Sequence, residues 1–187
     1  TEPVGQAPLK SQQMLEIAKS IMSDAQQKEF DETMELNMAI SVPNIGRYRV
    51  NLFRQRGEIA MVIRFIKGNI PSLESLRLPP ILSSIVMEAR GMILVVGATG
   101  SGKSTALAAM IDYRNTNYNG HILTIEDPIE YLHHHKKSIV DQREVGIDTL
   151  SYDNALHNAM REAPDAILIG EIRDRSTMKH AISYSET

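Results

Sequence analysis

The sequence predicts an α/β fold preceded by a smaller α+β module. Up to about residue 67, apolar and polar residues alternate as they do in half-buried strands. After Gly91 the candidate strands become short unbroken apolar runs, which are typical of a parallel sheet covered on both faces. A glycine-rich stretch connects one of these runs to a helical segment. We therefore expect a first module over residues 1–70, a linker over 71–80 and an α/β domain over 81–187.

The first module is expected to contain two helices followed by three strands. Apolar residues fall at helical spacing from Ser11 to Met22, and Ser23 can cap a second helix that runs through Ala25 to Phe30. The alternation then predicts strands over residues 38–42, 48–52 and 61–65. Short turns at residues 43–46 and 56–57 favour an antiparallel meander.

The second module is expected to alternate strands and helices. A helix from about Pro80 to Ala89 leads to Gly91, which is well placed as a left-handed terminator. Short apolar runs predict strands over residues 93–96, 122–125 and 166–169. Helical stretches over residues 103–113 and 152–162 separate them, and residues 178–182 look like the start of another helix. This order favours a doubly wound parallel sheet.

Composition excludes several classes of protein. The 187 residues carry 20 Lys and Arg against 23 Asp and Glu, a net charge of −3, so we do not expect direct binding to nucleic acid or to an anionic membrane. The longest apolar run, Met92 to Val96, is far below the roughly 20 residues of a membrane-spanning helix, and no signal-peptide pattern opens the chain. The sequence has no cysteine, which excludes disulfides and thiolate metal sites within it. We expect a cytoplasmic protein.

One motif predicts a nucleoside triphosphate site. The Gly-x-x-x-x-Gly-Lys-[Ser/Thr] pattern is satisfied by Gly97, Ala98, Thr99, Gly100, Ser101, Gly102, Lys103 and Ser104. The loop follows a predicted strand and opens a predicted helix, where backbone N–H groups and the helix dipole can hold phosphates. Lys103 would add a positive charge, the Ser104 hydroxyl could ligate Mg²⁺, and Thr105 would support the helix turn. A strand-to-helix turn without function is the alternative interpretation.

Acidic residues follow two other predicted strands. Glu126 and Asp127 come after one strand and Glu171 after another, and ligands of open α/β sheets bind beyond the carboxyl ends of strands. One carboxylate could hold Mg²⁺ and another could orient the attacking water. Capping or solvation of the strand ends is the alternative, and it weighs more for Asp127 and Glu130, which Pro128 separates. The sequence has no Asn-Lys-x-Asp pattern, so we expect adenine rather than guanine as the base.

The run His133-His134-His135 suggests a metal site but does not support one. Adjacent side chains point in different directions, and the sequence offers no cysteine or carboxylate set at ligand spacing beside them. We expect these residues to form a polar loop.

Several motifs in register resemble those of the secretion ATPases of type II and type IV systems, and most closely the type IV pilus retraction ATPases of the PilT and PilU type. The resemblance runs from about Leu9 to the end of the chain. It is carried by the phosphate loop and by residues 124–130, 142–145 and 161–171. It implies a PAS-like domain over residues 1–70 and a RecA-like ATPase domain over residues 81–187, cut short after Walker B. Because family members continue past both ends, and Thr1 and Thr187 show no start or stop signal, we expect further chain on both sides.

The resemblance also implies roles for single residues. Glu126 resembles the catalytic glutamate that acts as general base, Glu171 resembles the Walker B glutamate near Mg²⁺, and Lys103 with Ser104 resembles the Walker A pair. Arg49 and Arg64 are the best matches for arginines that the family places near the nucleotide. Three further arginines, Arg47, Arg54 and Arg56, are equally available nearby.

The function implied is a homo-hexameric ATPase that uses ATP and Mg²⁺ to drive pilus retraction and twitching motility. Its expected partner is an inner-membrane pilus platform protein, with a paralogous retraction ATPase as a further candidate, and membrane association would occur only through partners at the cytoplasmic face. Three other functions use the same phosphate site: a RecA-like nucleic-acid translocase, a small-molecule phosphotransferase, and a regulatory subunit that binds ATP without hydrolysing it.

Overall fold

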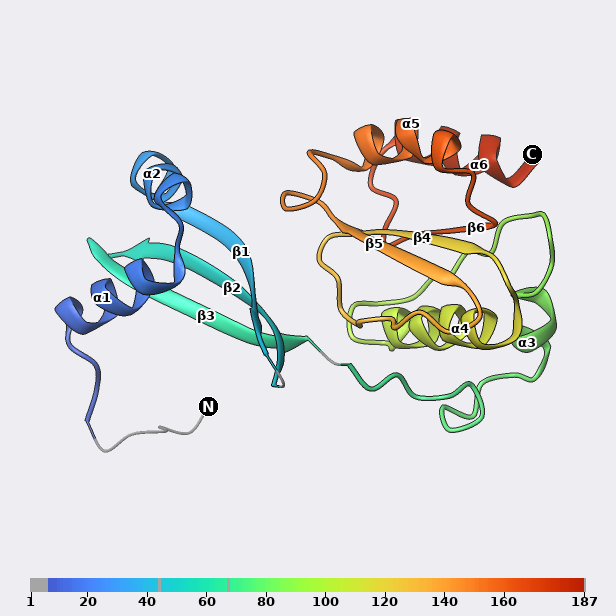
Figure 1. Ribbon diagram of the computed structural model, residues 1–187, viewed down its shortest axis with the longest axis horizontal. Helices are drawn as coiled ribbons and strands as arrows, with labels where there is room; N and C mark the ends of the chain where they lie inside the picture. The colour runs from blue at the N-terminus through green and yellow to red at the C-terminus, as the bar shows by residue number, and fades with distance from the viewer. Residues whose placement is uncertain (1–6, 44, 67, 187) are drawn as a thin grey trace. The chain divides into compact units, whose positions relative to one another are not determined.

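The computed structural model describes residues 7–43, 45–66 and 68–186 of the chain. These residues form two compact units, Thr1–Phe65 and Ile66–Thr187, each with its own sheet and core (Figure 1). One residue of the predicted turn at 43–46, Asn44, lies outside the described residues, as do the two chain ends named above. Within the described part, no helix is both long and apolar enough to cross a membrane.

The first unit begins with the two predicted helices, α1 (Ser11–Ile21) and α2 (Asp24–Thr33). Ser23 caps α2 as expected, since its hydroxyl accepts a hydrogen bond from the backbone N–H of Gln26 at 3.3 Å. The Gln26 side chain returns the contact by accepting from the Ser23 backbone N–H at 2.9 Å. This reciprocal capping box satisfies two donors that a helix end would otherwise leave free.

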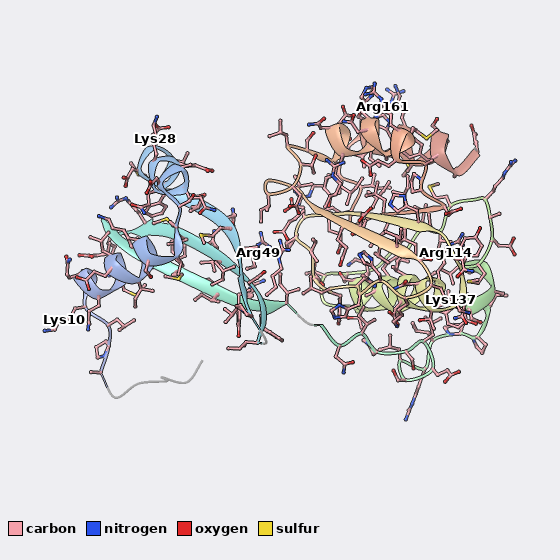
Figure 2. All side chains as sticks on the ribbon, in the orientation of Figure 1. Lys10, Lys28, Arg49, Arg114, Lys137 and Arg161 are labelled. Carbon is pink, nitrogen blue, oxygen red and sulfur yellow. The ribbon has the colours of Figure 1, made fainter. Side chains whose placement is uncertain are left out.

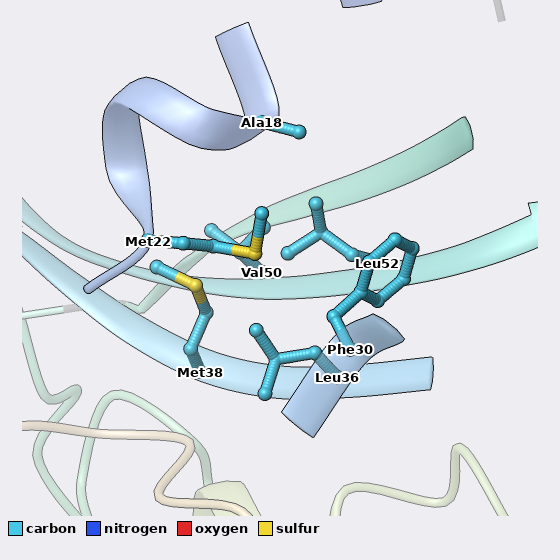
Figure 3. Close-up of a cluster of buried hydrophobic side chains, with 7 residues drawn as sticks. All are labelled: Ala18, Met22, Phe30, Leu36, Met38, Val50 and Leu52. Atoms are coloured by element: carbon cyan, nitrogen blue, oxygen red, sulfur yellow. The ribbon is translucent and has the colours of Figure 1, made fainter. Parts of the chain in front are cut away.

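Three strands follow, as predicted: β1 (Glu35–Val42), β2 (Gly46–Gln55) and β3 (Glu58–Ile66), in the sheet order β1-β2-β3. β1 pairs antiparallel with β2, with Met38 opposite Val50. Figure 3 shows side chains of both helices packed on one face of this sheet. The buried members of this core are Ala18, Met22, Phe30, Leu36, Met38, Val50 and Leu52.

The second unit contains a parallel sheet of three strands. β4 (His121–Glu126) lies between β5 (Ile139–Glu144) and β6 (Ala166–Ile169) and runs parallel to both. Helix α4 (Lys103–Asn117) covers one face, and α5 (Tyr152–Glu162) with α6 (Arg175–Glu186) covers the other (Figure 1). The alternation along β4 explains this layering. Ile122 packs with Ile111 of α4, whereas Leu123 packs with Leu156 of α5.

Three elements differ from the expectations. The run over residues 93–96 is not a strand in the described structure, because it pairs with no neighbouring strand, and pairing defines a strand. The helix expected from residue 80 to 89 is only α3 (Ile81–Ile85), although Gly91 does have a positive φ of +116°. The sequence does not predict β5, because the strand has few apolar residues. Val140 and the charged Glu144 are nevertheless both buried in it.

A buried arginine links three separate segments of the second unit. Arg114 of α4 is 3% exposed, and its Nη1 donates to the carbonyl oxygens of Val86 at 2.7 Å and Glu88 at 3.1 Å. Its Nη2 donates to the carbonyl oxygen of Asp165, just before β6, at 3.5 Å. The guanidinium also lies over the ring of Tyr118, 4.6 Å from the ring centre. Arg114 therefore joins the region after α3 to the entry of β6.

Candidate functional site

The glycine-rich loop lies at the start of α4, as predicted. Gly102 is the N-cap of this helix with a φ of +91°. Residues that carry a side chain adopt this left-handed backbone conformation only with strain. The Lys103 ammonium donates to the carbonyl oxygens of Gly97 at 3.0 Å and Ala98 at 2.9 Å, so it curls back over its own loop. The loop glycines are exposed, and the positively polarised helix N-terminus lies directly behind them.

The loop opens onto a cavity of about 270 Å³ at the carboxyl ends of β4 and β6. The structure brings six predicted site residues to its wall, namely Thr99, Gly100, Lys103, Ser104, Glu126 and Glu171. The weaker candidates Asp127 and Glu130 also line it. The other loop positions and Thr105 do not belong to this lining. Strand ends far apart in sequence therefore converge on one site, as an open α/β sheet predicts.

Gly170 allows the two strand ends to approach closely. Its backbone N–H donates to the Ile125 carbonyl oxygen at 2.8 Å. A Cβ at position 170 would lie 3.2 Å from the Glu126 Cα and 3.3 Å from the Ile125 carbonyl oxygen. These contacts are tight and involve backbone, so the absent side chain is what brings Glu126 and Glu171 to one cavity.

The Glu126 carboxylate is held by two hydrogen bonds. Its Oε1 accepts from the Thr124 hydroxyl at 2.7 Å and from Gln142 Nε2 at 3.2 Å. Burial raises the pKa of Glu126 above its usual value, and the hydrogen bonds from Thr124 and Gln142 oppose that rise. A buried carboxylate with a raised pKa is a stronger base than an exposed one, which suits the acceptance of a proton from water.

The Glu171 carboxylate is paired with an arginine. Arg173 Nη2 lies 2.5 Å from Glu171 Oε1, and Arg173 Nη1 lies 3.6 Å from Asp127 Oδ2. Tyr152 of α5 lines the same cavity, and burial followed by the negative charges of Glu171 and Asp127 raises the pKa of its hydroxyl, which stays protonated. This side of the site is thus acidic, and the Arg173 guanidinium bridges its two carboxylates.

Tyr131 and His133 are among the residues of the cavity wall that sequence reasoning missed. Their side chains are only 7% and 9% exposed, and with Ile129 they form an alternating buried series that the expected polar loop overlooked. The Tyr131 hydroxyl lies 3.0 Å from the Thr105 hydroxyl of α4. Burial lowers the pKa of His133 to about 4, so the imidazole is neutral near pH 7. Period-two burial was the signal that could have placed both residues inward.

No cluster of three or more His, Asp or Glu side chains with metal-binding geometry occurs in the described ranges. Mg²⁺ does not need one, since it commonly takes one or two protein oxygens and completes its shell with phosphate oxygens and water. The Ser104 hydroxyl and the Glu171 carboxylate line the same cavity as Lys103 and fit that requirement.

The predicted arginines lie in the first unit. Arg49 of β2 and Arg64 of β3 line a hollow of about 250 Å³ with Asn37, Asn51 and Val62 (Figure 2 labels Arg49). Arg54 faces elsewhere, since it lies 3.6 Å from Asp31 and over the ring of Phe30. Arg49 and Arg64 therefore share one hollow, and Arg54 does not line it.

Comparison with known proteins gives consistent matches. The family described as "Type II/IV secretion system protein" matches residues 38–187. The chain is 53% identical over 185 residues to the type IV pilus ATPase PilU of Pseudomonas aeruginosa, covering 99% of this chain and 48% of that protein. It is 45% identical over 180 residues to the type IV pilus retraction ATPase PilT of the same organism, covering 96% of this chain and 52% of the relative.

Among solved structures, a crystal structure of the pilus retraction motor PilT with bound ADP matches with a TM-score of 0.89 and 46% identity. That match covers 92% of this chain and 50% of the other. The chain therefore spans about half the length of the curated relatives and of the solved structure that it matches.

Proposed function

This chain belongs to the type II/IV secretion system protein family, and on that premise we propose that the full-length protein is an ATP-hydrolysing motor of the type IV pilus machinery. It drives pilus retraction and twitching motility. The observation that carries the proposal is the convergence of Lys103, Ser104, Glu126 and Glu171 on one cavity. The names of the PilU and PilT relatives support the assignment to pilus retraction.

The fold proposal follows the same relatives. We infer that residues 1–70 are part of a PAS-like domain, residues 71–80 a linker, and residues 81–187 part of a RecA-like ATPase domain. The parallel sheet with helices on both faces supports the last of these assignments.

ATP binding in this site begins with the phosphate loop. The N–H groups of residues 97–104 and the α4 N-terminus attract the β- and γ-phosphates, and the Lys103 ammonium exchanges its loop carbonyls for phosphate oxygens. Ser104 and Glu171 would hold Mg²⁺. When bound, that ion neutralises charge on the phosphate oxygens. The cavity lies close to the lower end of the roughly 300–1,000 Å³ of small-molecule sites.

Hydrolysis requires a base for the attacking water. Glu126 accepts a proton from that water as the water oxygen attacks the γ-phosphorus. The bond between the γ-phosphorus and the oxygen that leaves with ADP breaks. Its burial beside the phosphate loop supports this role, because a carboxylate there is both basic and fixed. Glu126 ends β4 and Glu171 follows β6, so ion binding and proton transfer can be separate tasks.

Assembly is the remaining part of the proposal. The protein acts as a homo-hexamer. Movement of domains or subunits brings Arg49 and Arg64 to the nucleotide, where they neutralise phosphate charge. Because hydrolysis depends on these arginines, it is coupled to assembly. It works at the cytoplasmic face of the inner membrane on the pilus platform protein, with a paralogous retraction ATPase as a further partner. It makes no direct contact with nucleic acid.

The test is steady-state ATPase activity of the full-length protein with Lys103→Ala and Glu126→Gln, with oligomeric state measured by light scattering. We expect activity from a hexamer that both substitutions abolish. ATP binding should be retained in Glu126→Gln and weakened in Lys103→Ala. Binding without turnover in the unmodified protein would instead indicate a regulatory subunit, and stimulation by DNA would indicate a translocase.

A further inference from the structure

Gln142 of β5 belongs to a motif that has no role in the chemistry described so far. It is the first residue of the segment 142–145, and the parallel register of the sheet places it beside Thr124 of β4. Thr124 is fully buried and already donates to Glu126. The register thus places a second side chain within reach of the same carboxylate.

The side-chain amide of Gln142 uses both of its ends. Its Nε2 donates to Glu126 Oε1 at 3.2 Å and to the Tyr131 carbonyl oxygen at 2.9 Å. Its Oε1 accepts from the backbone N–H of His133 at 2.7 Å. One side chain therefore fixes both the carboxylate and the loop that forms the adjacent cavity wall.

This pattern defines the orientation of the amide. Exchanging its oxygen and nitrogen would place an oxygen against Glu126 Oε1 and against the Tyr131 carbonyl oxygen, and an N–H group against the His133 N–H. All three contacts would become repulsive. Gln142 is therefore a donor to Glu126, and it cannot turn away without losing its contacts to the wall.

We propose that Gln142 is a positioning residue for Glu126, holding its carboxylate in line with the attacking water and against the cavity wall. The inference rests on the proposed function, because it assigns a partner to the base of that reaction. Catalytic groups need placement within about 0.5 Å, and a misplacement of about 1 Å can cost roughly 100-fold in rate. Gln142 touches no reacting atom in this role and acts only through Glu126.

The first experiment compares Gln142→Met and Gln142→Glu in the full-length protein. Met keeps the length of the side chain without its hydrogen bonds, whereas Glu keeps the acceptor for His133 but not the donors. We expect kcat to fall about 10- to 100-fold in both variants, with the KM for ATP within about threefold of the unmodified value. Asp141→Asn is the matched control, because Asp141 is the adjacent β5 residue and contacts His121 instead. Its kcat should be unchanged.

A second experiment separates positioning from a general structural effect. Glu126→Gln abolishes turnover but retains ATP binding, so in that background Gln142→Met should leave the Kd for ATP within about threefold of the value for Glu126→Gln alone, because Gln142 acts on the carboxylate and not on the nucleotide. A larger loss of ATP affinity in that background, or an equal effect on KM and kcat in the single variant, would overturn the proposal. Thermal unfolding of each variant identifies a protein that has failed to fold, and Gln142→Glu then serves as the test.

The two proposals fail in different ways. If the unmodified protein hydrolyses no ATP, or if Glu126→Gln retains full activity, the proposed function is wrong in its choice of base or activity. If Glu126→Gln is inactive but both Gln142 variants match the unmodified kcat, only the positioning role is wrong.

Discussion

The hydroxyls of Thr105 and Tyr131 lie 3.0 Å apart and join the first turn of α4 to the loop that follows β4. Tyr131 lines the cavity, and Thr105 follows Ser104 of the phosphate loop, which also lines it. Because Gln142 donates to the Tyr131 carbonyl oxygen, the same wall is tied at two points. The cavity wall at Tyr131 is thus held by two contacts from residues outside the phosphate-loop pattern.

Tyr131→Phe removes the hydroxyl contact while keeping the ring. We expect the free energy of unfolding to fall by about 1 kcal/mol, the usual contribution of one hydrogen bond, as measured by urea unfolding. Tyr113→Phe is the control, because Tyr113 lies on α4, the helix of Thr105, with 37% of its surface exposed. Its change should stay within about 0.5 kcal/mol. Equal effects of the two substitutions would contradict the bracing role.

Gly170→Ala tests the close approach of β4 and β6. The added Cβ would press on the backbone of Ile125 and Glu126, so we expect a loss of about 1–3 kcal/mol in unfolding free energy and a lower kcat. Gly68→Ala is the matched control, because a Cβ there meets nothing within 4 Å. A Gly170→Ala protein as stable and active as the control would show that the strand ends can separate freely.

His133 predicts a pH dependence of stability. Its pKa is lowered to about 4 in the folded protein from an ordinary 6.5, so the unfolded chain takes up a proton first as the pH falls. The contribution of neutral His133 to the free energy of unfolding is therefore complete above pH 6.5 and is lost as the pH drops toward 4. It amounts to about 3 kcal/mol in total.

Urea unfolding across that range measures the effect. We expect His133→Leu to have a flatter profile than the unmodified protein, whereas substitution of the exposed His157 by Asn should leave the profile unchanged. Parallel profiles for the unmodified protein and His133→Leu would mean that His133 takes up its proton equally in both states.

Arg173 predicts an effect on the ion requirement. Its guanidinium lies 2.5 Å from Glu171, the carboxylate proposed to face Mg²⁺, and a cation at that position competes with the ion. We expect Arg173→Gln to lower the Mg²⁺ concentration that gives half-maximal ATPase activity. Arg175→Gln is a control on the neighbouring helix start, with no expected change. A higher Mg²⁺ requirement in Arg173→Gln would mean that the arginine helps to hold the nucleotide.

Local patterns predicted much of the site but not its connections. The phosphate loop is predicted by its own pattern, and Glu126 and Glu171 are predicted because each lies at the end of an apolar run that does form a strand. Gln142 and its contact with Glu126 are not, because β5 has a mostly polar sequence and its register with β4 is a long-range property.

The same reasoning explains the errors in the fold. Residues 93–96 have the composition of a buried strand, yet a strand exists only with a partner, and composition does not name the partner. The run of three histidines indicates a polar loop because it offers no metal-ligand spacing, whereas the alternation of His133 with Ile129 and Tyr131 places it in a buried series. Spacing would have been the better guide there.

The buried guanidinium of Arg114 has a consequence for how the second unit opens. Its acceptors come from Val86, Glu88 and Asp165, so release of either chain segment would leave a desolvated charge short of acceptors. Such a state is costly, and the two segments should therefore exchange their amide hydrogens with similar free energies, as one cooperative block. We therefore expect the segment after α3 and the entry of β6 to open together rather than one after the other.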